Sequence, residues 1–304
     1  IVCLLLAGIL LGFAPVAEAA VWVHGGDDRW DNSVNWGGAV PTSADFAIFT
    51  DGSNATTALI DSATAAEANR ILLGDSLPAD DNTINVTGGT LDVNQFDVGW
   101  VGTGRVNITG GTVNAGALRF GGGGNQYPNQ GIVTVDGGAL NVGSHITIPA
   151  FTDGSHQHTL NMISGTTTAS GILIVGDNVP NTNGRVNMTG GTIDVAHLGI
   201  PLNDDASGST GHFQLDGGIL TVSTTTPSGQ TTGAIATLPT GLRIFADGDR
   251  RGSMDITGGT MILGGDSTAA VQEYVNSGVL TANNDPGQVV FDFDVTNPGF
   301  TTVS

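Results

Sequence analysis

The sequence predicts an all-β protein built as a single-stranded, right-handed parallel β-helix, also called a β-solenoid. It is closed by an N-terminal β cap and by a C-terminal cap of one short helix and a hairpin. Two observations predict this fold class. A motif of alternating apolar residues around a Gly pair, as in "VNITGGTVNAGALRFG" at residues 106–121, recurs along the chain. The repeats also follow at a nearly constant spacing, and periods of about 20–50 residues are typical of solenoids.

The second Gly of each Gly pair, or the Gly of Ser-Gly-Thr, marks the repeat. The markers are Gly89, Gly111, Gly138, Gly165, Gly191, Gly218 and Gly259. Successive markers are 22, 27, 27, 26, 27 and 41 residues apart. Because stacked repeats share one elongated core, we expect one long body rather than the two globular domains that the length alone would allow.

Each repeat unit contains three short apolar alternations. In one unit these are Val106 with Ile108, then Val113, then Leu118 with Phe120. An alternation of period two sends these side chains to one side of a strand, and the Gly residues provide the positive φ angles that a sharp bend needs. One three-stranded coil cannot cover its own apolar face, so we expect successive coils to stack with parallel pairing.

Equivalent positions in successive units support this register. The position two residues before the Gly pair is always apolar: Val86, Ile108, Val135, Met162, Met188, Leu215 and Ile256. The preceding position is always polar: Asn85, Asn107, Thr134, Asn161, Asn187, Gln214 and Asp255. We therefore predict an inward apolar column beside an outward polar column, whose amides and hydroxyls bond to one another along the rod.

The chain divides into four segments. Residues 1–19 are expected to be a signal peptide, residues 20–80 an N-terminal cap with a preliminary coil, residues 81–265 the β-helix repeats, and residues 266–304 the C-terminal cap. Trp22, Trp30 and Trp36 fall in the N-terminal cap, where they would form a small core; sugar-stacking platforms are the alternative. In the C-terminal cap, Asp266 or Ser267 would begin a helix that Gly278 ends, before a hairpin.

The beginning of the sequence indicates export. An apolar run is followed by Ala17-Glu18-Ala19, which has the form of a signal-peptidase site. Because no initiator Met precedes Ile1, we expect the start of the signal to be missing. Cys3 is the only cysteine and lies within the signal, so the exported chain would have no disulfide. We expect export through the Sec pathway to the cell surface or the extracellular space, without membrane insertion after signal cleavage.

The charge of the chain limits its partners. Its 28 acidic residues outnumber its 8 basic residues, which gives a net charge of -20. A surface this acidic repels phosphates, so we expect no nucleic acid partner and no binding to anionic lipid. Extracellular polysaccharides and other surface proteins are the partners that remain.

Three stretches resemble a known group of proteins. The stretches are "NWGGAVPTSADFAIF", coils such as "INVTGGTLDV", and the ending "YVNSGVLTA" with "FDFDVTNPGFTTVS". Together they resemble secreted bacterial repeat proteins with autotransporter-like β-strand repeats, of the planctomycete or PEP-CTERM-associated type. The resemblance implies a solenoid architecture and a role at the cell surface or in the matrix, and it implies no particular activity.

Parallel β-helices also carry polysaccharide lyases and glycoside hydrolases, so we considered catalytic groups. Asp92 and Asp194 share a column but stand four coils apart, about 19 Å at strand spacing, whereas a glycosidase needs two carboxylates within about 5–9.5 Å. Asp97 and Arg119 occupy similar places in consecutive coils, which suggests a surface ion pair rather than a catalytic pair. The remaining catalytic candidates are Asp204, Asp205, His156 and Arg119.

The longest insertions follow the third strand of each unit and would stack along one edge of the rod, where solenoids often bind ligands. Trp100, Tyr127 and Phe151 lie in these insertions. Aromatic rings stack on sugar faces, so these three residues are the candidate glycan-binding residues. The alternative is that the aromatic residues clamp the loops onto the rod.

Neither a cofactor nor a metal site is expected, and one stretch is considered as an alternative. Asp247 and Asp249 could form a Ca²⁺ loop, although two Arg residues follow them. We expect His212 at the position of His158 two coils further on, with Arg185 between them, an arrangement that would repel a cation.

The sequence thus favours a non-enzymatic protein, an exported structural or adhesin-like rod that binds glycans along its looped edge. The alternatives are a polysaccharide lyase or glycoside hydrolase on the same scaffold, and a Ca²⁺-stabilised surface-layer subunit.

Overall fold

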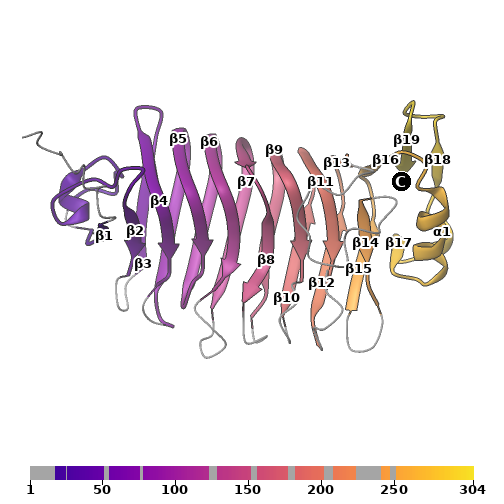
Figure 1. Cartoon of the computed structure of the whole chain (residues 1–304), viewed down its shortest axis with the longest axis horizontal. Helices are drawn as coiled ribbons and strands as arrows, with labels where there is room; N and C mark the ends of the chain where they lie inside the picture. Colours follow the sequence, from indigo (N-terminus) through magenta and orange to yellow (C-terminus); the bar gives the residue numbers. More distant parts are fainter. Residues whose placement is uncertain are drawn as a thin grey trace, which may run out of the picture.

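The computed structural model describes residues 18–24, 26–50, 55–75, 78–122, 129–151, 156–176, 182–201, 208–223, 241–246 and 251–304. The chain forms a right-handed parallel β-solenoid of about eight turns, which confirms the predicted fold class. Figure 1 shows the coils stacked along the long axis, with β1 near one end and α1 at the other.

Each coil has three sides, and equivalent strands of successive coils pair in parallel to form faces A, B and C. Face A contains β3 (Ala55–Ile60), the first parts of β5 (Asp81–Val98), β6 (Thr103–Gly121), β7 (Gln130–Val142) and β9 (His158–Val175), and then β10 (Asn183–Met188), β12 (Thr210–Leu215), β15 (Arg251–Ile256) and β17 (Leu280–Ala282).

Face B follows face A around the next bend of the coil. It contains the first parts of β4 (Ala65–Leu73) and β11 (Thr192–Ile200), the middle parts of β5, β6 and β9, the end of β7, and then β13 (Ile219–Val222) and β16 (Thr260–Gly264). Face C contains β1 (Ala19–Trp22), β2 (Phe46–Phe49), the ends of β4, β5, β6, β9 and β11, and β8 (Ile146–Phe151) and β14 (Leu242–Ile244).

The bends between faces A and B carry the predicted glycines. At five markers the φ angle is positive: Gly89, Gly111, Gly165, Gly191 and Gly218. In the coil of β7 the positive φ belongs to Gly137 instead of the marker Gly138. Because hydrogen bonding continues around some bends, β5 runs as one strand of 18 residues through all three faces instead of three separate strands.

The core is a column of apolar side chains inside the coils. The seven inward positions predicted on face A are all buried, with no side chain more than 2% exposed: Val86, Ile108, Val135, Met162, Met188, Leu215 and Ile256. Their neighbours in the chain point outward and bond along the rod. Asn107 donates to Asn85 at 2.9 Å, and Asn187 donates to Asn161 at 3.0 Å. The predicted register of these two columns is confirmed.

The N-terminal cap is an aromatic cluster that covers the first coil. Trp22, Trp30 and Trp36 are at most 4% exposed and surround Phe49, with the Trp36 ring 5.5 Å from the Phe49 ring. Trp36 lies on the short helix η1 (Ser33–Trp36), and its Nε1 donates to the Trp30 carbonyl at 2.7 Å. The interpretation of these tryptophans as a cap core is therefore confirmed.

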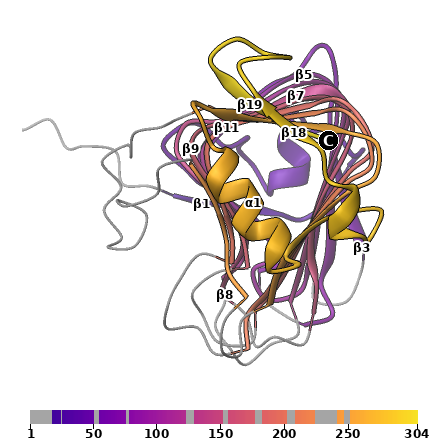
Figure 2. The same ribbon diagram turned by 90° about the vertical axis from the view of Figure 1, so that its right-hand side faces the viewer.

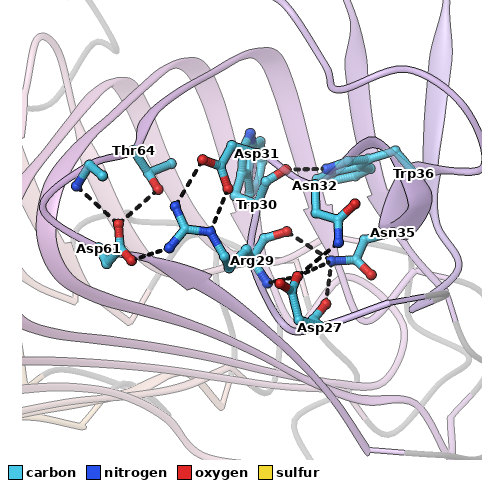
Figure 3. A network of polar contacts seen from close by, with 10 residues as sticks. Asp27, Arg29, Trp30, Asp31, Asn32, Asn35, Trp36, Asp61 and Thr64 are labelled. Atoms are coloured by element: carbon cyan, nitrogen blue, oxygen red, sulfur yellow. Dashed lines mark hydrogen bonds and ion pairs between the residues drawn. The ribbon is translucent and has the colours of Figure 1, made fainter.

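A polar network ties this cap to the solenoid (Figure 3). Arg29 contacts Asp31 at 2.9 Å and Asp61, at the bend after β3, at 2.5 Å. Backbone bonds join the same two segments, because the Trp30 amide donates to the Leu59 carbonyl at 3.0 Å. The edge of β3 is thus covered, which prevents pairing with another chain there.

The C-terminal cap crosses the other end of the solenoid (Figure 2). It contains α1 (Thr268–Asn276), the turn η3 (Pro286–Gln288) and the hairpin of β18 (Phe291–Phe293) and β19 (Phe300–Val303). Ser267 is the N-cap of α1 and Gly278 follows its end with a φ of 72°, as predicted. The cap is anchored because β19 pairs antiparallel with β16 and Tyr274 donates to the Leu242 carbonyl at 3.1 Å.

Candidate functional site

The bend between faces B and C is hollowed into a groove of about 850 Å³, which we call the corner groove. Apart from Ser43, which precedes β2, its described lining comes from successive coils at equivalent positions: Ala68, Asp92, Val93, Asn94, Asn114, Ala115, Gly116, Asn141, Val142, Gly143, Thr168, Ala169, Ser170, Asp194, Ala196 and Ser223. Coils rise by about 4.8 Å each, so a groove that crosses six coil steps is about 29 Å long.

Small residues at the bend create the hollow. Each coil turns from face B to face C at one short residue: Asn94, Gly116, Gly143, Ser170, Ala196 and Ser223. At Gly116 a Cβ atom would lie 2.4 Å from the Asn94 carbonyl oxygen, so no side chain fits there. At Ser170 the hydroxyl donates to the Gly143 carbonyl of the preceding coil. Short side chains that bond to the backbone leave the space above them open.

The floor of the groove is apolar. It is formed by Val93, Ala115, Val142 and Ala169, whose side chains are 3–5% exposed. The inward neighbours two residues earlier, among them Leu91, Val113 and Leu140, are at most 1% exposed. The floor side chains are therefore the part of the core that solvent reaches from the groove.

One rim of the groove is a polar column on face B, which we call the rim ladder. Strand pairing places Asp92, Asn114, Asn141, Thr168 and Asp194 directly above one another. Asn114 donates to Asp92 at 2.7 Å, Asn141 donates to Asn114 at 3.0 Å, and Thr168 donates to Asn141 at 3.1 Å. These bonds fix the orientation of each side chain relative to the groove.

The rim ladder retains hydrogen-bonding capacity. An amide group has two N–H donors and two acceptor lone pairs. In the ladder, Asn114 and Asn141 each donate once to the coil before and accept once from the coil after. Counting bonds to the described part of the chain, one donor and one lone pair per amide are therefore left for a ligand. Asn114 is exposed and Asn141 is half-buried, so both are accessible from solvent.

The charges of the groove are acidic and far apart. Among the described residues that line it, Asp92 and Asp194 are the charged ones, and both are exposed. They stand four coil steps apart, which is about 19 Å. This confirms the predicted spacing and is too long for a pair of carboxylates that act on one glycosidic bond.

Arg119 serves an ion pair on face C. Its Nε lies 2.8 Å from Asp97 in the preceding coil, and Arg70, one coil earlier, lies 2.7 Å from the other oxygen of the same carboxylate. The predicted pairing of Asp97 with Arg119 is confirmed, but the carboxylate is fully buried instead of lying on the surface. Arg119 therefore already holds an anion of the protein itself.

Trp100 packs against the rod. The guanidinium carbon of Arg70 lies 4.7 Å from the centre of the Trp100 ring. The ring is also close to Gly122, where a Cβ atom would lie 2.1 Å from a ring carbon. The Trp100 ring is half-buried and is absent from the lining of the corner groove.

Most of the other candidates from the sequence, including those of the Ca²⁺ loop, fall outside the described residues. This holds for Tyr127, Asp204, Asp205, Asp247 and Asp249, and for the side chain of Phe151. His156 is described, is half-buried, and does not line the corner groove.

The expected alignment of His212 with His158 is wrong. Strand pairing aligns His212 with Arg185 and then with Thr159, whereas His158 aligns with Gly184. A shift of one residue moves a side chain to the opposite side of a strand. His158 is accordingly buried inside the coil, where it accepts from the Gly131 amide at 3.0 Å, and His212 points outward to Ser253.

Within the described ranges, no three His, Cys, Asp or Glu side chains gather closely enough to hold a metal ion. No helix in the same ranges has the length and apolar character needed to cross a bilayer. Comparison of the chain with protein-family models, with curated proteins and with solved structures finds no match. The geometry of the groove is therefore the basis for a functional assignment.

The corner groove was not predicted from the sequence. The sequence pattern that marks the groove is weak, because the bend residues are of different types and have only their small size in common. Only part of the rim ladder was recognised in the sequence. Asp92 and Asp194 were placed in one column, as two acids too far apart for catalysis.

Proposed function

We propose that the protein is an exported, non-catalytic rod, an adhesin or structural component of the cell surface or extracellular matrix that binds glycans along its side. The observation that carries this proposal is the use of outward polar side chains to bond coil to coil, as in the face A bond between Asn85 and Asn107 and the rim ladder bond between Asp92 and Asn114. Such bonds stiffen the rod. They also occupy polar side chains that an enzyme would need to leave available for its substrate.

The rod is also closed where strand edges would be exposed. Arg29 and its neighbours cover β3, and β19 pairs with β16 at the other end. Capped edges prevent uncontrolled assembly, which suits a protein that presents its side to a partner. The acidic surface, with a net charge of -20, favours an uncharged partner over an anionic one.

The enzymatic alternative is a polysaccharide lyase or hydrolase, and its best-placed carboxylates are on face A. Asp216 and Asp255 both accept from the Gln214 amide, at 2.7 and 3.3 Å. Burial would raise the pKa of Asp255, but hydrogen bonds from Thr281, the Asn284 amide and Gln214 lower it overall. A general acid needs a raised pKa and access to substrate, and Asp255 is only 3% exposed. This pair therefore supports the structure of face A better than it supports catalysis.

A second acidic pair lies near the start of the solenoid. Burial raises the pKa of Asp75, which Arg70 lowers and Asp80 raises further. A raised pKa suits a general acid, but Asp80 is 1% exposed and cannot approach a polysaccharide. Neither of these two described pairs therefore offers two accessible carboxylates, which supports the proposal of binding without turnover.

The test is to incubate residues 20–304 with neutral and acidic polysaccharides, and to measure both retention of the protein and release of new chain ends. We expect retention on at least one polysaccharide and no products. Products that disappear in the Asp216→Asn or Asp75→Asn variant would replace this proposal with the enzymatic one. Retention on no glycan would remove the adhesin role.

A further inference from the structure

We infer that the corner groove binds one neutral, extended glycan chain that lies parallel to the solenoid axis, with about one sugar unit for each coil. This inference rests on the proposed glycan-binding role and assigns it to a site away from the looped edge.

The first argument is the repeat of the groove. The lining offers the same kinds of groups once per coil, at a rise of about 4.8 Å. A sugar unit in an extended glycan advances the chain by a comparable distance. A polymer with a regular repeat can therefore place each unit in an equivalent environment along the six steps from Ala68 to Ser223.

The second argument is the cross-section of the groove. The floor residues Val93, Ala115, Val142 and Ala169 present small apolar surfaces, and the bend residues above them have short side chains. The face of a sugar ring is also apolar and can lie on such a floor. One side of the ring then meets the rim ladder, where hydroxyl groups find amide donors and acceptors.

The third argument is the direction of the rim bonds. Each amide of the rim ladder is held by its neighbours in the coils before and after, as Asn114 is held by Asp92 and Asn141. Side chains fixed in this way lose little conformational freedom when a ligand binds. The matching groups of the ligand must be both donors and acceptors, which is the property of a hydroxyl group.

The fourth argument is charge. Asp92 and Asp194 stand near the ends of the rim ladder, and no basic residue is among the described residues that line the groove. Uronate and sulfate groups would meet like charges without a counter-ion, which disfavours acidic glycans. A peptide strand is disfavoured because backbone groups near the floor already bond between coils, as the Gly143 amide does with the Ala115 carbonyl.

The test compares two pairs of variants, each pair within one coil. Gly143→Tyr places an aromatic ring in the groove, and the backbone there leaves room for its Cβ atom, whose nearest neighbour would lie at 3.6 Å. Thr134→Tyr places the same side chain on face A of the same coil. Asn114→Ala and Asn107→Ala each remove one ladder amide of β6, the first in the groove and the second on face A.

The ligands are β-1,4-linked gluco- and manno-oligosaccharides from the disaccharide to the octasaccharide, with oligogalacturonates of the same lengths, measured by calorimetry. We expect the affinity for one neutral series to rise with length up to about six units, one for each coil step. We expect Gly143→Tyr to lower it at least about tenfold and Asn114→Ala about threefold to tenfold, consistent with one or two lost hydrogen bonds. The two face A variants should bind as the parent does.

The outcomes separate this inference from the proposed function. If a glycan binds and Gly143→Tyr leaves its affinity unchanged, the groove assignment is wrong, although the adhesin role stands. If oligogalacturonates bind as tightly as the neutral series, the charge argument fails and with it the ligand class. If the parent binds no glycan on an array or in these series, both proposals fail. Thermal unfolding of all four variants shows whether each one is folded.

Discussion

The Arg119 guanidinium lies 2.8 Å from the carboxylate of Asp97, its partner in the preceding coil, and the carboxylate is fully buried. Arg70 approaches the same carboxylate from the other side at 2.7 Å. Three successive coils of face C are thus joined through one anion. Removal of that anion leaves two guanidinium groups close together without their shared partner.

We predict that Asp97→Ala lowers the free energy of unfolding by about 3 kcal/mol, since loss of one member of a buried ion pair leaves the others uncompensated. Urea unfolding of the parent and the variant measures this difference. The control is Asp81→Ala, which removes the exposed partner of Arg105 and should cost less than about 1 kcal/mol. Equal losses in both variants would show that the burial of Asp97 has no energetic consequence.

A second prediction concerns two glycines. At Gly165 the φ angle is +83° and a Cβ atom would lie 2.2 Å from the Gly138 carbonyl oxygen, whereas at Gly143 the nearest atom would be at 3.6 Å. Gly165→Ala should destabilise the protein by more than about 2 kcal/mol, because it adds both strain and a clash. Gly143→Ala should change stability by no more than about 0.5 kcal/mol. Thermal unfolding distinguishes the two, and similar midpoints would contradict the described bend at Gly165.

A third prediction concerns the N-terminal cap. Trp36 donates from its Nε1 to the Trp30 carbonyl, whereas within the described residues the Nε1 of Trp30 has no acceptor. Trp36→Phe should therefore cost about 1 kcal/mol more than Trp30→Phe, the value of one hydrogen bond. Chemical unfolding followed by tryptophan fluorescence measures the difference. A larger loss for Trp30→Phe would mean that its indole N–H has a partner.

A fourth prediction concerns acid stability. Burial opposes ionisation of Asp255, but its hydrogen bonds lower its pKa below the ordinary value of 3.8. A carboxyl with a lowered pKa in the folded state stabilises the fold above its ordinary pKa, and this stabilisation is lost as the pH falls from 3.8 through the folded-state pKa. The free energy of unfolding should therefore fall in this window, and less steeply in Asp255→Asn. Urea unfolding over a pH series measures both slopes, which would be identical if Asp255 were not involved.

Much of the fold follows from the sequence because strand alternation and the repeat reinforce each other. Positions such as Val86 and Ile108 are equivalent both by period and by their distance from a glycine, so their burial could be predicted. His212 was misplaced because its coil could be aligned from the repeat only to within one residue, and one residue reverses the direction of a side chain.

The candidate site was harder to predict than the core. The aromatic residues of the insertions suggested a looped edge, but Trp100 packs against Arg70 instead of facing the groove. The groove arises from missing volume at the bends, for example at Gly116 and Ser170. Different small residues can leave the same empty space, so no single residue type marks the groove in the sequence. The groove can be recognised only when the coils are stacked.

The rim ladder has a consequence for how such a protein can change over time. Each coil brings its own floor residue, bend residue and rim side chain, and the bonds of Asn141 to the coils before and after would form equally well with a copy of either neighbour. Duplication of one coil would therefore extend the groove by about 4.8 Å and leave its chemistry unchanged. The number of repeats in the gene would then determine the length of polymer that the protein binds, and natural selection could change this length by one unit at a time.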